Sequence, residues 1–188
     1  MGIQKKHYIC TVTYKEQENE GTEVPSFYSQ MISKKKVIGL INERMEELDN
    51  GLFIVEVDIS SANVIKVELD KHEGNVSVED CIRVSRNVEH NLDREEQDFE
   101  LSVSSAGLDK GLRVYPQYKK NIGRDVKVKL NEGGKLEGKM IDATEEQIVV
   151  QTTRKERIEG KKKKETIIED HVLTMDQIKD TKIVISFK

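Results

Sequence analysis

Residues 101–112 read LSVSSAGLDKGL, and the character of the chain changes across this stretch. It begins with apolar residues at every second position, Leu101 and Val103, which predicts a β-strand with one buried face. It continues with two hydroxyls, a glycine that can expose its backbone amide, and then Asp109 and Lys110. This polar turn predicts a junction between two separately folded parts of the chain.

The part before the junction, residues 31–108, predicts an α+β domain in the order α-β-β-α-β. Ser33 and Ser77 are placed to cap two amphipathic helices, and Asp80 completes a variant capping box with Ser77. In chain order the expected elements are a helix (34–49), a strand (52–59), a strand (64–70), a helix (78–93) and a strand (99–104). The first two strands form an antiparallel hairpin, and both helices are expected to lie on one face of a three-stranded sheet.

The part after the junction predicts a small Sm-like or SH3-like β-barrel over residues 116–188, with residues 109–115 as the linker. A short helical turn is expected at 115–121, and a turn or 3₁₀ segment at 173–180. Gly138 falls in mid-strand, where a small barrel bends sharply. The expected strands are short and divided by polar turns, as in such barrels, and they cover 124–130, 135–141, 147–153, 165–169 and 181–187.

Acidic and basic residues are distributed unequally between the two parts of the chain. The chain carries a formal net charge of −4, but residues 1–115 hold 22 acidic and 14 basic side chains, whereas residues 116–188 hold 13 and 17. The acidic half suits a basic protein and the basic half suits phosphate. With 5% aromatic residues and no Trp, the cores must be built from Val, Ile and Leu, and a base-stacking platform is not expected.

Targeting signals and metal motifs are missing from the sequence. No stretch approaches a membrane span, and Cys10 and Cys81 form neither a disulfide framework nor a metal knuckle, so a cytoplasmic protein without membrane contact is expected. Residues 1–30 are expected to be a poorly ordered extension that is not native, with Met31 as the natural start. The four histidines lack metal-ligand spacing, and no nucleophile elbow or phosphate loop occurs, so neither catalysis, metal nor cofactor is expected.

A basic run lies late in the chain, with Arg154, Lys155 and Arg157 followed by Lys161 to Lys164. Such a cluster can neutralise several phosphates of an RNA backbone. It is equally consistent with a solvated hairpin loop whose lysines discourage edge-to-edge strand pairing. Both interpretations remain open from the residues alone.

The junction resembles the signature of the ribosome maturation factor P family, Ser-Ser-Pro-Gly-Leu-Asp-Arg-Pro-Leu. The chain departs from it with Ala106 and Gly111 at the two prolines and with Lys110 at the arginine, which loosens the turn and replaces a planar fork by a point charge. Asp80-Cys81 followed by Ser85-Arg86 is similar to the helix signature of the family, and Gly123 with Val126 and Val128 resembles its entry into the barrel. The matching junction residues are Ser104, Ser105, Gly107, Leu108, Asp109 and Leu112.

The resemblance implies a non-catalytic ribosome assembly factor for the small (30S) subunit, monomeric when free. It would bind the immature small subunit through rRNA and through the small-subunit ribosomal protein of the decoding centre. From the resemblance and the charge pattern together, the expected contact residues are Arg86, Ser104, Ser105, Gly107, Leu108, Asp109, Lys110, Arg113, Arg124, Lys127, Lys129, Arg154, Lys155, Lys161 and Lys162.

Three alternatives remain. The chain can be a general Sm-like RNA-binding protein without a dedicated ribosomal role, which predicts affinity for free RNA. The junction can be only a capped interdomain turn, with Ser105 or Asp109 bonding local amides. A hydrolase hidden in the interdomain cleft requires a closed pocket with converging titratable groups.

Overall fold

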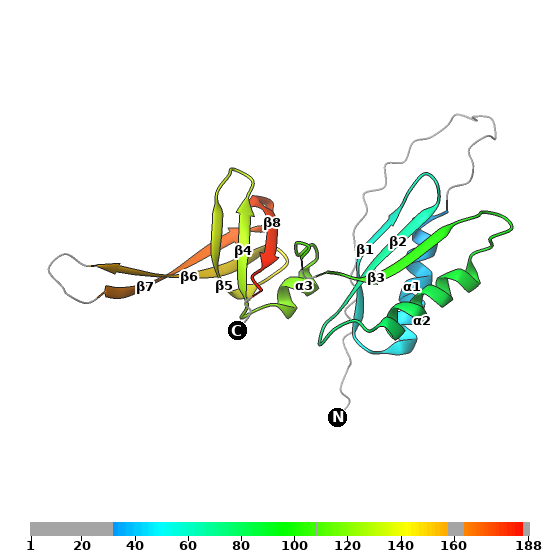
Figure 1. The fold of residues 1–188 in the computed structure, drawn as a ribbon, viewed down its shortest axis with the longest axis horizontal. Helices are drawn as coiled ribbons and strands as arrows, with labels where there is room; N and C mark the ends of the chain where they lie inside the picture. Colours follow the sequence, from blue (N-terminus) through cyan, green and yellow to red (C-terminus); the bar gives the residue numbers. More distant parts are fainter. Residues whose placement is uncertain (1–31, 108, 158–163, 186–188) are drawn as a thin grey trace, which may run out of the picture.

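A computed structural model describes residues 32–107, 109–157 and 164–185 of the 188-residue chain. The N-terminal unit is mixed α+β, with two helices on one face of a three-stranded sheet (Figure 1). The expected α+β class is therefore confirmed. The elements of this unit are α1 (Lys34–Leu48), β1 (Leu52–Ile59), β2 (Val64–Lys71), α2 (Val78–Asn91) and β3 (Glu100–Ser105).

Strand β2 lies at the centre of the first sheet, antiparallel to β1 and parallel to β3. Its alternating apolar residues Ile65, Val67 and Leu69 are fully buried. They form one core cluster with apolar side chains of both helices, including Ile41 and Val84. The helices cover only this face of the sheet. The alternate residues of β2, such as Glu68, therefore lie on the opposite, open face.

The cap of α2 ties the helix to the hairpin. The Ser77 hydroxyl accepts from the Asp80 amide at 3.1 Å, and the Asp80 carboxylate accepts from the Ser77 amide at 2.9 Å, so the capping box is present. Asp80 also accepts from Lys71 Nζ at 2.9 Å and from Asn50 Nδ2 at 2.8 Å. Burial opposes ionisation of Asp80, but these hydrogen bonds outweigh it and lower the pKa of the carboxyl to about 2.

The C-terminal unit is a five-stranded antiparallel sheet in the order β7-β6-β5-β4-β8, preceded by one short helix. No ladder joins β7 to β8 within the residues described, so backbone pairing leaves these two strands as edges and the closed Sm-like barrel stays a prediction. The elements are α3 (Tyr115–Lys120), β4 (Asp125–Leu130), β5 (Lys135–Ala143), β6 (Gln147–Arg157), β7 (Lys164–Thr174), the 3₁₀ turn η1 (Met175–Gln177) and β8 (Ile178–Ile183).

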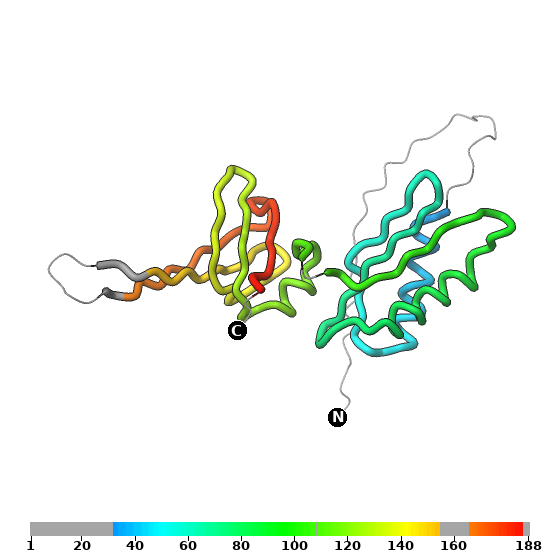
Figure 2. The backbone as a smooth tube through the Cα atoms, viewed as in Figure 1, coloured from blue at the N-terminus to red at the C-terminus, as the bar shows by residue number. Residues whose placement is uncertain are grey.

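A second core cluster covers one face of this sheet, with Val126, Val128, Met140 and Ile148 fully buried and Tyr118 of α3 packed against them. Gly138 is required where β5 lies against β6, because a Cβ there would overlap the carbonyl oxygen of Gln151. The two clusters share no residue. A single segment of backbone leads from the N-terminal unit to the C-terminal unit (Figure 2).

Two expectations about the strands are wrong. Strands β6 and β7 are much longer than expected and project beyond the sheet as a two-stranded arm, so Arg154, Lys155 and Arg157 lie in a strand and not in a loop (Figure 1). The last strand begins at Ile178, earlier than the expected Thr181, because it pairs with β4 as soon as η1 ends. The proposed extension, residues 1–30, lies outside the described residues. Along the parts that are described, no helix is long and apolar enough to cross a membrane.

Candidate binding surface at the junction of the two sheets

The junction, residues 106–114, is attached by its backbone to both sheets. It leaves the first sheet at Ala106, whose amide donates to the carbonyl of Leu69 at 2.8 Å, and reaches the second at Leu112, whose amide donates to the carbonyl of Thr181 at 2.8 Å. Between them the Lys110 amide donates to the Gly107 carbonyl at 3.2 Å and closes a turn. The path of the chain is therefore held at both ends by strand hydrogen bonds.

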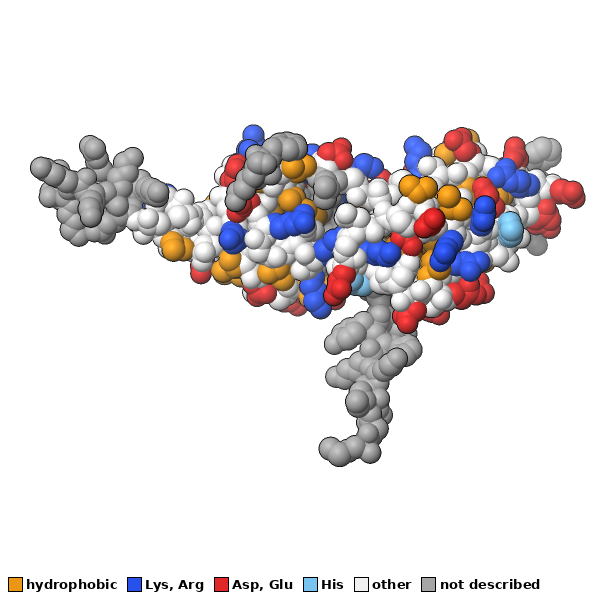
Figure 3. Space-filling view, turned by 60° about the horizontal axis from the view of Figure 1, so that its bottom comes forward, with side chains coloured by type: hydrophobic (Ala, Val, Ile, Leu, Met, Phe, Trp, Pro, Cys, Tyr) orange, Lys and Arg blue, Asp and Glu red, His pale blue; other side chains and the backbone are white. Residues whose placement is uncertain are grey.

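Three cations reach from the junction and α3 to the open face of the first sheet. Lys110 pairs with Glu68, and the Arg113 guanidinium bridges Glu68 and Glu56. Lys120 Nζ pairs with Asp70 at 2.7 Å. We refer to these four ion pairs as the junction clasp; Figure 3 shows acidic and basic side chains next to one another in the middle of the molecule.

Strand register explains why cations are needed there. A bulge in β1 between Ile54 and Glu56 sets Glu56 directly opposite Glu68 of β2. Like charges at opposite positions destabilise a strand pair, and a guanidinium that bridges both carboxylates removes the repulsion. Partial burial opposes ionisation of Glu68, but the hydrogen bonds from Lys110 and Arg113 prevail and lower the pKa of its carboxyl below the ordinary value.

Helix α3 fixes the C-terminal end of the junction. Gln117 is buried; its Oε1 accepts from the Arg113 amide at 2.9 Å, and its Nε2 donates to Asp70 at 3.5 Å. The hydroxyl of buried Tyr118 donates to the carbonyl of Leu112 at 3.2 Å. Burial raises the pKa of the Tyr118 phenol, so the group stays a neutral donor at ordinary pH.

Gly111 stands where the family signature has its second proline, and its surroundings are filled. A Cβ at this position would overlap Asp180 Oδ1, and the same Asp180 pairs with Lys129 Nζ at 3.4 Å. Gly107 is crowded in the same way by the carboxylate of Asp109. Across the described residues, neither Ser105 nor Asp109 bonds a local amide through its side chain; strand pairing and the clasp hold the turn instead.

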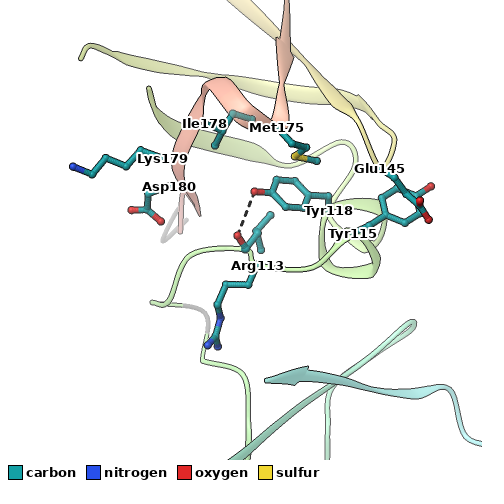
Figure 4. A pocket seen from close by; sticks show the side chains of 9 residues that line it. Arg113, Tyr115, Tyr118, Glu145, Met175, Ile178, Lys179 and Asp180 are labelled. Carbon is teal, nitrogen blue, oxygen red and sulfur yellow. Dashed lines mark hydrogen bonds between the residues drawn. The ribbon is translucent and has the colours of Figure 1, made fainter. Parts of the chain in front are cut away.

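A pocket of about 360 Å³ lies beside the junction (Figure 4). Tyr118 lies against Met175 and Ile178 inside it, while Arg113 extends away from it toward the first sheet. Its lining contains no Ser, Cys or His, so these residues form no Ser–His or Cys–His pair. The lining residues are Leu112, Arg113, Tyr115, Tyr118, Glu145, Met175, Ile178, Lys179 and Asp180.

The structure brings together only part of the expected contact set. Ser104 and Ser105 are exposed at the end of β3, next to Gly107, Asp109, Lys110 and Arg113 of the junction. Leu108 lies outside the described residues.

A second group is on or next to β4. Lys127 pairs with Glu137 at 3.2 Å, Lys129 pairs with Asp180, and Arg124 is exposed just before the strand.

The remaining expected residues lie apart from the junction. Arg86 is exposed on α2, and Arg154 pairs with Glu169 at 3.0 Å where the arm begins. Lys155 belongs to β6, but its side chain is not described, and Lys161 and Lys162 lie outside the described residues. Among the described side chains, none pairs with Arg86 or Arg124, so these two cations are free for a partner.

Sequence reasoning missed the carboxylates of the clasp, Glu56, Glu68 and Asp70, and the cation Lys120. Alternation along residues 64–70 places Glu68 and Asp70 on the solvent face. Two carboxylates on this solvent face, together with basic residues in the linker, are a sequence signal for ion pairs between the sheet and the linker. No group of three or more His, Cys, Asp or Glu is placed to hold a metal ion in the described ranges.

Comparison with known proteins identifies relatives over most of the chain. Residues 40–109 match the family model of the RimP N-terminal domain. A ribosome maturation factor RimP of Christiangramia forsetii is 44% identical over 153 residues, which cover 81% of this chain and 99% of the relative. The one of Flavobacterium psychrophilum is 36% identical over 157 residues, 84% of this chain and 100% of the relative.

A third relative, from Porphyromonas gingivalis, is 32% identical over 149 residues, 79% of this chain and 96% of its own length, and carries the same name. The class to which these matches assign the chain is that of the ribosome maturation factors. Within it, the chain belongs to the RimP family. The resemblance noted at the junction is thereby confirmed.

Proposed function

We propose that the chain acts in the cytoplasm, without catalysis or cofactor, in maturation of the small (30S) ribosomal subunit. It binds immature subunits as a monomer through rRNA and through the small-subunit ribosomal protein of the decoding centre. The observation that carries this proposal is the match to ribosome maturation factors over nearly their whole length. We also propose two separately folding domains, 31–108 and 116–188, the second an Sm-like barrel, joined by a linker at 109–115.

The ion pairs divide the expected contact residues into two kinds. Lys110 and Arg113 neutralise carboxylates of the first sheet in the free protein, so their first role is to position the two units. Arg86 and Arg124 are exposed and have no internal ion pair among the described residues, so they can bind a phosphate without losing an ion pair inside the protein. We assign rRNA contact first to Arg124, which lies on the basic half of the chain, and to Arg86 on α2.

Co-sedimentation with immature small subunits tests the proposal. The wild-type chain should sediment with the subunits, and binding should weaken as salt rises from about 50 to 200 mM, because each phosphate contact releases counterions. Arg124→Glu should weaken binding and lower the salt slope by about 1 or more. Lys35→Glu, an equal charge change at an exposed position of α1, is the matched control and should bind as the wild type.

Two results would count against the proposal. A wild-type chain that stays wholly in the ribosome-free fraction removes the ribosomal role. Equal affinity of the full chain for bare, unrelated RNA and for immature subunits favours the general Sm-like RNA-binding alternative.

A further inference from the structure

Strand β7 ends the second sheet and has one free edge. The sheet order places β6 on one side of β7, and no described strand pairs with the other side. The ladder with β6 runs the whole length from Lys164 to Thr174, so the free edge is long enough to pair with another strand. An edge of this kind presents unpaired backbone N–H and C=O groups to any extended chain.

Apolar side chains accompany this edge. Ile168 and Val172 are 59% and 58% exposed, and because they lie four residues apart on one strand they point to the same face. Val149 of β6, half-buried, lies directly opposite Val172 and extends the patch across the sheet. Figure 3 shows hydrophobic side chains at the surface near the base of the arm.

A carboxylate lies between the two apolar residues. Asp170 is exposed on the same face as Ile168 and Val172, and it accepts one hydrogen bond, from Gln151 Nε2 at 2.9 Å. No described cation pairs with it, whereas Glu169 on the opposite face is paired with Arg154. The face therefore reads apolar, acidic, apolar along the edge strand.

This order disfavours a second copy of the chain as the occupant. If a copy of β7 lies antiparallel so that Ile168 meets Val172, the two Asp170 carboxylates lie directly opposite each other. Like charges at opposite positions of a strand pair are destabilising. A strand that carries Lys or Arg at that position, with apolar residues two positions to either side, complements the edge instead.

We propose that the free edge of β7 binds an extended basic segment of a partner protein as an added strand. Backbone hydrogen bonds supply the pairing, while apolar side chains opposite Ile168 and Val172 and a Lys or Arg opposite Asp170 supply selectivity. The inference deepens the proposed function, on which it rests only for the source of the segment: a ribosomal protein of the immature subunit.

The probe is a fluorescent nine-residue peptide in which Lys, Val, Lys, Val and Lys alternate with Thr. Full-length protein should bind it more tightly than the same peptide with Glu in place of Lys. N-methylation of alternate backbone amides should also weaken binding, because it blocks strand pairing without changing charge. Asp170→Lys, and separately the pair Ile168→Lys with Val172→Lys, should each reduce affinity roughly tenfold or more. Val78→Lys, at a 76% exposed position of α2, is the control and should bind as the wild type.

The outcomes separate this inference from the proposed function. Equal binding of the N-methylated or the Glu peptide, or unchanged binding by Asp170→Asn and Asp170→Lys with native circular dichroism, overturns the assignment to β7. A concentration-dependent dimer that Ile168→Lys dissociates assigns the edge to a second copy and also overturns it. Selective peptide binding by a chain that ignores immature subunits removes the ribosomal role and leaves the edge site intact. If the chain still sediments with immature subunits but does not discriminate between the peptides, the edge site is removed and the ribosomal role stands.

Discussion

The two units neutralise their charges in different ways. In the N-terminal unit the open face of the sheet is acidic, and its carboxylates are met by cations that arrive from the junction and from α3. In the C-terminal unit the strand cations are met by carboxylates of the same sheet. The first set consists of Lys110–Glu68, Arg113–Glu56, Arg113–Glu68 and Lys120–Asp70; the second includes Lys127–Glu137, Lys129–Asp180 and Arg154–Glu169. Three of the clasp pairs lie within residues 1–115 and only Lys120–Asp70 joins the acidic half to the basic half, so a small part of the opposite net charges is used within the molecule.

Their cores differ as well. The first sheet is covered by two helices, whereas the core of the second is built around Val126, Val128 and Ile148 of its own strands, and α3 is the one α-helix that adds to it among the described residues. Because no residue belongs to both clusters, damage to one core should leave the other folded.

Core truncation is the strongest test of this separation. Leu69→Ala should destabilise the N-terminal unit, and Ile148→Ala the C-terminal unit, by about 3 kcal/mol each, because both side chains are fully buried. Hydrogen exchange followed by mass spectrometry should show lost protection only in the unit that carries the substitution. Equal loss across both units would mean one continuous core and would remove the two-domain proposal.

Asp80 provides the next largest effect, and it is confined to the N-terminal unit. Asp80→Asn should cost about 2 kcal/mol of unfolding free energy, since it weakens a buried ion pair and a helix cap together. Because the pKa of this carboxyl is lowered from 3.8 to about 2 in the folded state, its contribution is complete above pH 4 and is lost as the pH falls toward 2.

Urea denaturation between pH 2 and pH 6 measures this contribution. The gap between wild type and Asp80→Asn should narrow with acidification, and Glu79→Gln, at the exposed neighbouring position, is the control. A gap that stays constant over this range would show that the charge of Asp80 does not stabilise the fold.

Local sequence patterns predict the N-terminal unit almost to the residue. The serine caps mark both helix starts, and strict alternation marks β2, because here a buried face and a solvent face impose the period. The arm of the second sheet is missed for the opposite reason. Beyond Thr153 the strand is charged on both faces, so its residues carry no alternation, and only pairing with β7 makes it a strand.

The candidate site was predicted in part. A signature in sequence locates the junction, because the turn residues are contiguous. It does not reveal the clasp, since Glu56, Glu68 and Asp70 reach the junction through the register of β1 and β2 and not through sequence proximity. Ion pairs between residues far apart in the sequence depend on how the sheet is placed against the linker, and a local sequence pattern does not contain that information.

Gly111 tests how tightly the junction packs against the second sheet. Gly111→Ala should cost about 1 kcal/mol, because the new Cβ displaces Asp180 and its pair with Lys129. Asp180→Ala in the same chain should remove most of that cost. Gly39→Ala is the control: nothing lies near that position of α1, and the change should stabilise the N-terminal unit by about 0.5–1 kcal/mol. Thermal unfolding of the three variants beside the wild type measures these changes in stability. If Asp180→Ala does not reduce the cost of Gly111→Ala, the crowding explanation is contradicted.

The junction clasp has the smallest expected effect on stability and the most direct bearing on how the units are joined. Glu68→Lys should leave both cores folded and cost about 1 kcal/mol, since the ion pairs of this half-buried carboxylate are with cations that remain partly exposed, and such pairs contribute little. It should nevertheless broaden the distance between fluorophores placed on the two units, because Lys110 and Arg113 are then repelled from the first sheet. Lys110→Glu should act in the same direction but less strongly, as Arg113 still bridges Glu56 and Glu68.

The charge exchange Glu68→Lys with Lys110→Glu separates an ion pair from a mere loss of packing. If the pair positions the units, the double variant should recover part of the narrow distance distribution, and high salt should broaden the wild type toward Glu68→Lys. Acid should do the same: the folded-state pKa of Glu68 is lowered, so the clasp is complete above the ordinary pKa of a glutamate and weakens as the pH falls below it. Additive single effects with no recovery, or a distribution insensitive to salt and acid, would leave the backbone bonds of Ala106 and Leu112 as what positions the two units.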